Sequence, residues 1–177
     1  YSPTRYLFAR GLLEIARGDA PELRTTVAEI HTHALPAEDP DRTEEKAALY
    51  LEGMMLLASG KASVAVELLQ GADRIEGYRY ALYELGQATA LEQSGQHAQA
   101  LALAQKAETD RDPGDVRLDL EIDRVRAILL QSRCHASMGD TEEAARQAGR
   151  FLQRWHQADT MLEDIRLARA LAKNGAD

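Results

Sequence analysis

The sequence of 177 residues lacks several features that would assign a compartment. It contains one cysteine, so no disulfide can form within the chain and cysteine usage does not indicate an oxidising compartment. It has no apolar run of roughly eighteen residues and no visible signal peptide, which favours a cytoplasmic location without membrane insertion. Because the chain starts at Tyr1, we expect a fragment or a processed protein. A periplasmic location stays open if a preceding segment carries a membrane anchor.

Positive charge is also scarce, because 21 lysines and arginines face 29 acidic residues and the net charge is −8. This balance repels phosphate backbones, so we expect no nucleic-acid partner. One group of arginines has acidic residues interleaved with it, which predicts a salt-bridged helix surface. The arginines are Arg117, Arg124, Arg126 and Arg133, and the acidic residues are Asp115, Asp119, Glu121 and Asp123.

Catalytic motifs are absent as well: there is no glycine-rich phosphate-binding loop, no HExxH zinc motif and no GxSxG nucleophile turn. Cys134 and His135 are adjacent on an expected helix and point about 100° apart, so we predict a buried structural thiol. His31 and His33 are interpreted as a surface pair. We therefore expect no enzyme, no cofactor and no metal.

Two acidic clusters contain oxygen ligands of the kind that bind cations. Asp39, Asp41 and Thr43 begin like a calcium loop, but Glu44 occupies the position where the sharp turn needs glycine. The cluster Asp110, Asp112 and Asp115 is explained better by a turn followed by a capped helix.

The sequence does contain a repeated pattern around four glycines, which recur at intervals of 42, 35 and 44 residues: Gly18, Gly60, Gly95 and Gly139. A small residue stands seven positions before each one, which lets a neighbouring element approach closely: Gly11, Gly53, Ala88 and Ser132. Five, nine and twelve positions after each glycine, mostly small apolar residues trace one helical face: Leu23, Val27, Ile30, Ala65, Leu69, Ala72, Ala100, Ala104, Ala107, Ala144, Ala148 and Phe151. Each copy therefore predicts a helical hairpin with a tight glycine turn.

Strand-like alternation is missing, so we predict an all-α fold. The expected helices lie near residues 3–17, 21–35, 43–59, 61–74, 77–94, 96–109, 115–138, 141–157 and 160–174. Three of these helices have, at their start, residues that typically begin a helix. They are Ser2 before Pro3, Asp140 with Glu143, and Thr160 with Glu163, which forms a capping box.

The small residue, the glycine turn and the following alanine resemble the tetratricopeptide repeat over about residues 4–157, although that unit has about 34 residues. The family's aromatic position, four residues before each glycine, holds Glu14, Leu56, Leu91 and His135. The resemblance implies a right-handed α-solenoid in a single domain 1–177, with hairpins at 3–35, 43–74, 77–109 and 115–157 and a capping helix at 160–174.

The segments 151–159 and 168–173 resemble the end of repeat arrays in bacterial signalling proteins, where the array usually follows a serine/threonine kinase, a cyclase-like or a winged-helix regulatory domain. The long intervals also resemble the repeats of large ATP-dependent transcription activators. We expect the last helix to cover the fourth hairpin through Met161, Leu162, Ile165, Ala168 and Ala172. The alternative is an amphipathic helix that binds a partner.

In such arrays the first helices of the hairpins line a concave face. The resemblance places groove positions ten and six residues before each glycine: Phe8, Leu12, Tyr50, Met54, Leu85, Thr89, Leu129 and Arg133. This mostly apolar row lacks the lysine and asparagine of a carboxylate clamp and suits a helix or an extended peptide. The alternative is that the row is core.

We therefore expect a non-enzymatic interaction or sensory module of a larger bacterial regulator, which binds a protein or peptide through the concave face. The alternative is a structural spacer or a homodimerising element that positions a kinase, cyclase or DNA-binding domain. An all-α enzyme has no catalytic residues that the sequence could name.

Overall fold

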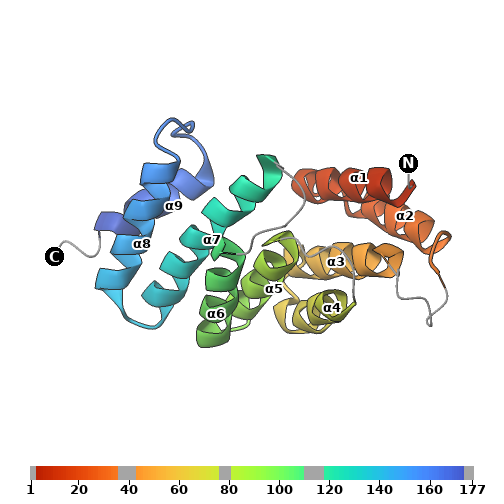
Figure 1. Ribbon diagram of the computed structural model, residues 1–177, viewed down its shortest axis with the longest axis horizontal. Coiled ribbons are helices and arrows are strands. Elements are labelled where there is room, and N and C mark those ends of the chain that lie inside the picture. The colour runs from red at the N-terminus through yellow and green to blue at the C-terminus, as the bar shows by residue number, and fades with distance from the viewer. Residues whose placement is uncertain (1–2, 36–42, 76–80, 110–117, 174–177) are drawn as a thin grey trace. The chain divides into compact units, whose positions relative to one another are not determined.

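The computed structural model describes residues 3–35, 43–75, 81–109 and 118–173, and this part of the chain is all-helical, as predicted (Figure 1). The helices are α1 (Pro3–Arg17), α2 (Ala20–His31), α3 (Thr43–Ala58), α4 (Ala62–Arg74), α5 (Ala81–Gln93), α6 (His97–Thr109), α7 (Leu118–Ser137), α8 (Thr141–Arg154) and α9 (Glu163–Lys173). The chain divides into two compact units, Tyr1–Arg79 with α1 to α4 and Tyr80–Asp177 with α5 to α9. Each unit is described by itself below.

The four predicted glycine turns are confirmed. Their φ angles are +70°, +76°, +82° and +84° at Gly18, Gly60, Gly95 and Gly139, the left-handed region that glycine adopts without strain. Each turn repeats the same pair of hydrogen bonds. The glycine N–H donates to the carbonyl three residues earlier, and the next N–H donates to the carbonyl five residues earlier. This is the Schellman motif that ends a helix, and it closes each of the hairpins α1–α2, α3–α4, α5–α6 and α7–α8.

The small residues of the repeat lie at close contacts, as predicted. A Cβ atom on Gly11 would lie 2.5 Å from Leu51 Cδ1 of α3, and one on Gly53 would lie 2.7 Å from Leu69 Cγ of α4. Ala88 and Ser132 are fully buried. Larger side chains at these positions would push neighbouring helices apart.

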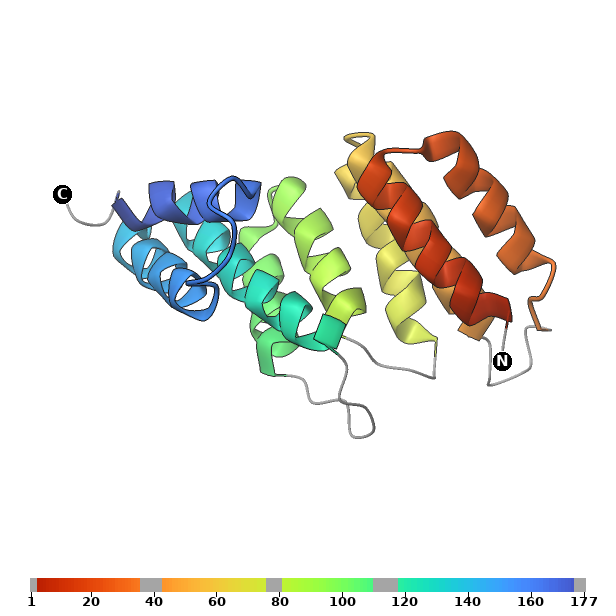
Figure 2. The same ribbon diagram turned by 90° about the horizontal axis from the view of Figure 1, so that it is seen from above.

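The apolar face of each second helix is also confirmed, because all twelve positions five, nine and twelve residues after the turn glycines are buried. Within unit 1, α1 contacts α2 and α3, and α3 also contacts α2 and α4. Within unit 2, α7 contacts α5, α6, α8 and α9 (Figure 2). Successive hairpins of a unit therefore pack against each other, which gives a repeat-like helical arrangement inside each unit.

Two helices end three or more residues before the predicted position. The second helix ends at His31 and not at residue 35, because the Thr32 hydroxyl donates to the Glu29 carbonyl at 2.7 Å and closes the last turn. The eighth helix ends at Arg154 and not at residue 157, since Trp155 leaves helical geometry with φ −108° and ψ 36°.

The predicted capping box of Thr160 and Glu163 is wrong. The last helix begins at Glu163, and the preceding turn is held by Asp159, whose Oδ1 accepts the Met161 N–H at 2.9 Å. The predicted cap at Asp140 is confirmed, because its Oδ1 accepts the Glu143 N–H at 3.2 Å. The first helix begins at Pro3 as expected, while Ser2 lies outside the described residues.

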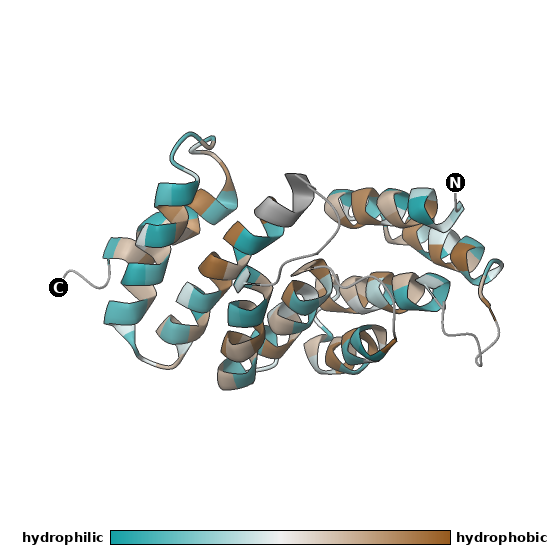
Figure 3. Ribbon diagram, viewed as in Figure 1, coloured by the Kyte–Doolittle hydropathy of each residue, from teal (hydrophilic) through white to brown (hydrophobic). Residues whose placement is uncertain are grey.

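The last helix covers the fourth hairpin, but with fewer residues than predicted. Ile165 and Ala168 are buried in one cluster with residues of α7 and α8, and Ala172 packs against it. Met161 and Leu162 precede α9 and are 73% and 45% exposed, so their predicted part in this cover is wrong. Figure 3 shows hydrophobic and hydrophilic residues alternating along the drawn helices. Within the described ranges, none of the helices combines the length and the hydropathy that crossing a bilayer requires.

Candidate interaction surfaces

The eight predicted groove residues fall into two sets. Phe8 and Leu12 of α1 and Tyr50 and Met54 of α3 belong to unit 1, and the other four, on α5 and α7, belong to unit 2. In each unit the first helix of one hairpin runs parallel to the first helix of the next hairpin. In unit 1, the contacts Thr4–Glu44, Phe8–Tyr50 and Gly11–Leu51 advance together along α1 and α3.

In unit 1 the four predicted residues form an apolar surface that we call the α1–α3 strip (Phe8, Leu12, Tyr50 and Met54). The rings of Phe8 and Tyr50 lie 5.7 Å apart at their centroids with an interplanar angle of 58°. Tyr50 is 2% exposed, whereas Phe8, Leu12 and Met54 are half-buried. Since Leu12 and Met54 follow Phe8 and Tyr50 by one helical turn on parallel helices, they extend the same strip.

A polar network fixes α1, and with it the strip, against α2. The buried Glu14 carboxylate accepts a hydrogen bond of 2.7 Å from the Thr26 hydroxyl, and Arg10 Nε lies 3.3 Å from it. Arg10 also donates to Glu29 at 2.7 Å, and this hydrogen bond raises the pKa of Arg10. Glu14 therefore links α1 to α2 through a buried hydrogen bond.

In unit 2 the corresponding residues do not form an apolar strip. Leu129 is 4% exposed and belongs to the core cluster with α8 and α9. Leu85 is half-buried against Ala81, Ala107 and Ala127, and Thr89 donates to the Leu85 carbonyl at 2.7 Å. Arg133 donates to Glu92 of α5 at 2.5 Å. Leu85, Thr89 and Arg133 are half-buried, and the row in this unit differs from the α1–α3 strip because it includes a threonine and an ion-paired arginine and because Leu129 is core.

Two arginines of α7 form ion pairs with residues of other helices. Arg133 bonds to Glu92 of α5, and Arg126 Nε lies 3.4 Å from Asp164 of α9. Both arginines are ion-paired, as expected for a salt-bridged helix surface, and these two partners lie on α9 and α5. Arg117 and Asp115 lie outside the described residues.

Cys134 is the buried thiol that the sequence predicts. It is fully buried, and desolvation, with a smaller contribution from the charge of Glu92, raises its pKa to about 11. A thiol with this pKa is almost entirely protonated at neutral pH and is a weak nucleophile.

His31 and His33 are both exposed, as the sequence predicts. His31 Nε2 lies 3.3 Å from Glu52 Oε1, while His33 follows the end of α2. The described residues include no group of three histidine, cysteine or acidic side chains that could hold a metal ion. The acidic residues Asp39, Asp41, Asp110, Asp112 and Asp115 lie outside the described part of the chain.

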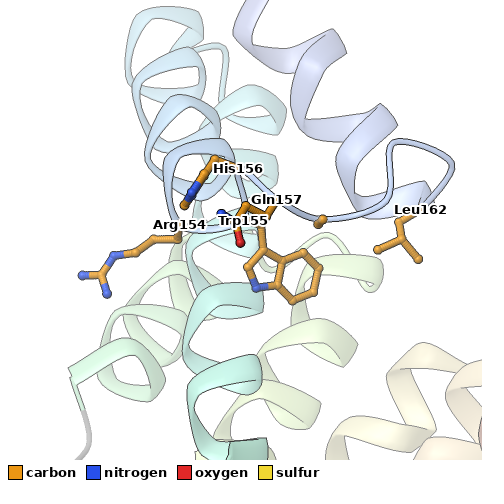
Figure 4. Close-up of a pocket in the computed structure, with 6 residues that line it drawn as sticks. Arg154, Trp155, His156, Gln157 and Leu162 are labelled. Carbon is orange, nitrogen blue, oxygen red and sulfur yellow. The ribbon is translucent and has the colours of Figure 1, made fainter.

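Sequence reasoning missed a hollow of about 310 Å³ beside the turn between α8 and α9 (Figure 4). Its lining includes Trp155, Ala158 and Leu162, and the Trp155 ring lies 5.1 Å from the ring of Phe151. Figure 4 shows the Arg154 guanidinium pointing away from the indole. His156 Nδ1 lies 3.1 Å from the Gln153 carbonyl, and the lining holds no carboxylate. The hollow can hold an apolar group but offers no acid–base pair.

The chain matches no protein-family model, no curated protein and no solved structure.

Proposed function

We propose that this chain is a non-enzymatic interaction module that binds a peptide or protein through the α1–α3 strip. In this proposal the four hairpins and α9 form a tetratricopeptide-like α-solenoid, and the module belongs to a larger bacterial signalling or regulatory protein. The resemblance of the glycine-turn hairpins to the tetratricopeptide repeat supports this arrangement.

The observation that carries the proposal is the partial exposure of three apolar residues on two parallel helices. Phe8, Leu12 and Met54 are half-buried, Phe8 contacts Tyr50 of α3, and Leu12 and Met54 each stand one helical turn further along their helices. Tyr50 lies beneath the Phe8 ring and is buried, so it holds that ring in place. A pre-ordered apolar surface loses little conformational entropy on binding.

The residues of the strip also indicate the kind of ligand. Aromatic and methionine side chains give adaptable, polarizable contact area, which suits the apolar side chains of a peptide helix or an extended peptide. No lysine or arginine belongs to the strip, so recognition of a terminal carboxylate is not part of the proposal.

The test is selection of peptides from a phage-displayed random library against the 177-residue chain, followed by measurement of their dissociation constants. We expect Met54→Glu and Leu12→Glu to weaken the selected peptides by about tenfold or more, since a charge would be buried under the ligand. Val64→Glu is the matched control, because Val64 is an apolar residue of α4 that is 51% exposed. Circular dichroism checks that all three variants fold.

Peptides that bind Met54→Glu and Leu12→Glu as tightly as the parent chain would contradict the proposal. So would a library that yields no binder, or a dimer of the parent chain that Met54→Glu disperses. That last result would favour the alternative of a self-associating spacer.

A further inference from the structure

The repeat register shows which face of a first helix packs against the preceding hairpin. In α3 this face holds Leu51, nine residues before the turn glycine, which meets Gly11 of α1. In α7 it holds Ala127, twelve residues before the turn glycine, which packs with Ala81 of α5 and Ala107 of α6. The positions twelve and nine residues before the turn glycine are therefore the inter-hairpin face, and both are buried in α3 and in α7: Ala48, Leu51, Ala127 and Leu130.

In α1 the equivalent positions are exposed. Tyr6 and Ala9 stand twelve and nine residues before Gly18, and Tyr6 is 69% exposed. Leu13 lies on the same helical face, one turn beyond Ala9, and is 48% exposed. We call these residues the α1 edge (Tyr6, Ala9 and Leu13). In Figure 1, α1 forms the upper border of its unit, with α2 and α3 below it.

The α1 edge carries positive charge on an acidic chain. Arg5 and Arg17 stand on the two sides of this stripe, about 120° apart around the helix axis, and are exposed. Within the described residues neither arginine has an ion-pair partner. The α1 edge is therefore an apolar stripe with a basic border, while the chain as a whole has a net charge of −8.

We propose that the α1 edge is a second docking surface, and that its ligand is an amphipathic helix of a partner protein whose apolar face has acidic residues at its sides. The partner helix packs on α1 in the way that α1 packs on α3. The α5–α6 hairpin packs on α7 in the same way. The apolar side chains of the partner helix cover Tyr6 and Leu13, and its carboxylates pair with Arg5 and Arg17.

Charge decides between this ligand and a second copy of the chain. If two copies met through their α1 edges, each would bring its own arginines to the same interface, and like charges would face each other. An acidic helix removes this repulsion and satisfies both arginines. The proposal does not depend on the α1–α3 strip.

The test uses a synthetic amphipathic helix of about four turns, with leucine on one face and glutamate at the flanks. Its dissociation constant for the 177-residue chain is measured by fluorescence anisotropy. We expect binding that weakens by about tenfold in Leu13→Glu and also weakens in Arg17→Glu. Raising the salt concentration from about 0.01 M to about 1 M, which shortens the screening length from roughly 30 Å to 3 Å, should weaken it as well.

Controls separate this surface from the α1–α3 strip. Met54→Glu and Val64→Glu should bind the acidic helix as the parent chain does, and a peptide with lysine in place of glutamate should bind far more weakly. The proposal is overturned if the acidic peptide does not bind, if Leu13→Glu has no effect, or if both peptides bind equally. A concentration-dependent dimer that Leu13→Glu disperses would also overturn it, because a second copy would then be the ligand.

Discussion

Gly53 illustrates how one residue sets the distance between two helices. A Cβ atom at this position would lie 2.7 Å from Leu69 Cγ, the branch point of a side chain that is 1% exposed. Because the branch point moves less easily than the end of a flexible side chain, the neighbouring helix itself must shift. Overpacking of this kind costs about 1–3 kcal/mol, and it opposes the gain of about 1 kcal/mol that alanine brings over glycine in a helix.

We therefore predict that Gly53→Ala lowers the free energy of unfolding, measured by urea denaturation, by up to about 2 kcal/mol. The control is Gly149→Ala in α8, where a Cβ atom would meet no atom within 4 Å and only the helix propensity changes. This variant should raise the free energy of unfolding by about 0.5–1 kcal/mol. Equal effects of the two substitutions would show that α3 and α4 do not pack closely at Gly53.

Cys134 gives a prediction for alkaline pH. Its pKa is about 11 in the folded chain against an ordinary value of 9.0, so the folded state holds the thiol proton to higher pH than the unfolded state does. The stabilising contribution of the protonated thiol is complete below pH 9.0 and is lost as the pH rises toward 11. We predict that the free energy of unfolding falls less steeply in Cys134→Ala than in the parent chain across this interval. Parallel pH profiles of the two proteins would count against a desolvated thiol.

Helix α9 shows what one element contributes to its unit. Ile165 and Ala168 extend the core of α7 and α8, which would otherwise end in an open apolar face. The hydrophobic residues just before the helix do not share this role, because the turn held by Asp159 leaves them in solvent. Between α9 and the residues just before it, α9 therefore makes the stabilising contacts.

We predict that Ile165→Ala lowers the free energy of unfolding of unit 2 by about 2–5 kcal/mol, through the loss of buried surface and the cavity that remains. Leu162→Ala is the matched control and should change it by less than about 0.5 kcal/mol, since Leu162 is 45% exposed. Hydrogen exchange followed by mass spectrometry should show the effect of Ile165→Ala in α7 and α8. A large effect of Leu162→Ala would mean that the turn also belongs to the core.

Helices and turns could be predicted wherever residues close in sequence determine them. The glycine turns, the small residues and the buried stripe depend on backbone conformation and helical periodicity, and both can be read from spacing alone. The ends of α2 and α9 were missed because Thr32 and Asp159 use their side chains to close turns, in competition with a longer helix. Nothing in the local periodicity distinguishes those turns from a helix that continues.

At the scale of the whole molecule, hairpins of one design pack in sequence within each unit, and long-range packing decides which of their faces stay open. The sequence placed Leu129 and Leu12 in the same predicted row, but residues of α8 and α9 pack around Leu129 in the core. Arg133 likewise bonds to Glu92, which is 41 residues away. Such contacts are set by elements distant in sequence, so the spacing alone could not predict that Leu129 is core or that Arg133 is ion-paired.

The most direct test of the interaction proposal uses the four methionines of the chain as reporters. Methyl-labelled methionine gives separate NMR signals for Met54 in the α1–α3 strip, for the adjacent Met55, and for Met138 and Met161 of unit 2. When a library-selected peptide is added, the account predicts a large shift of the Met54 signal and no change at Met138 and Met161. A shift at Met161, which precedes α9, or an unchanged Met54 signal at saturating peptide would contradict it.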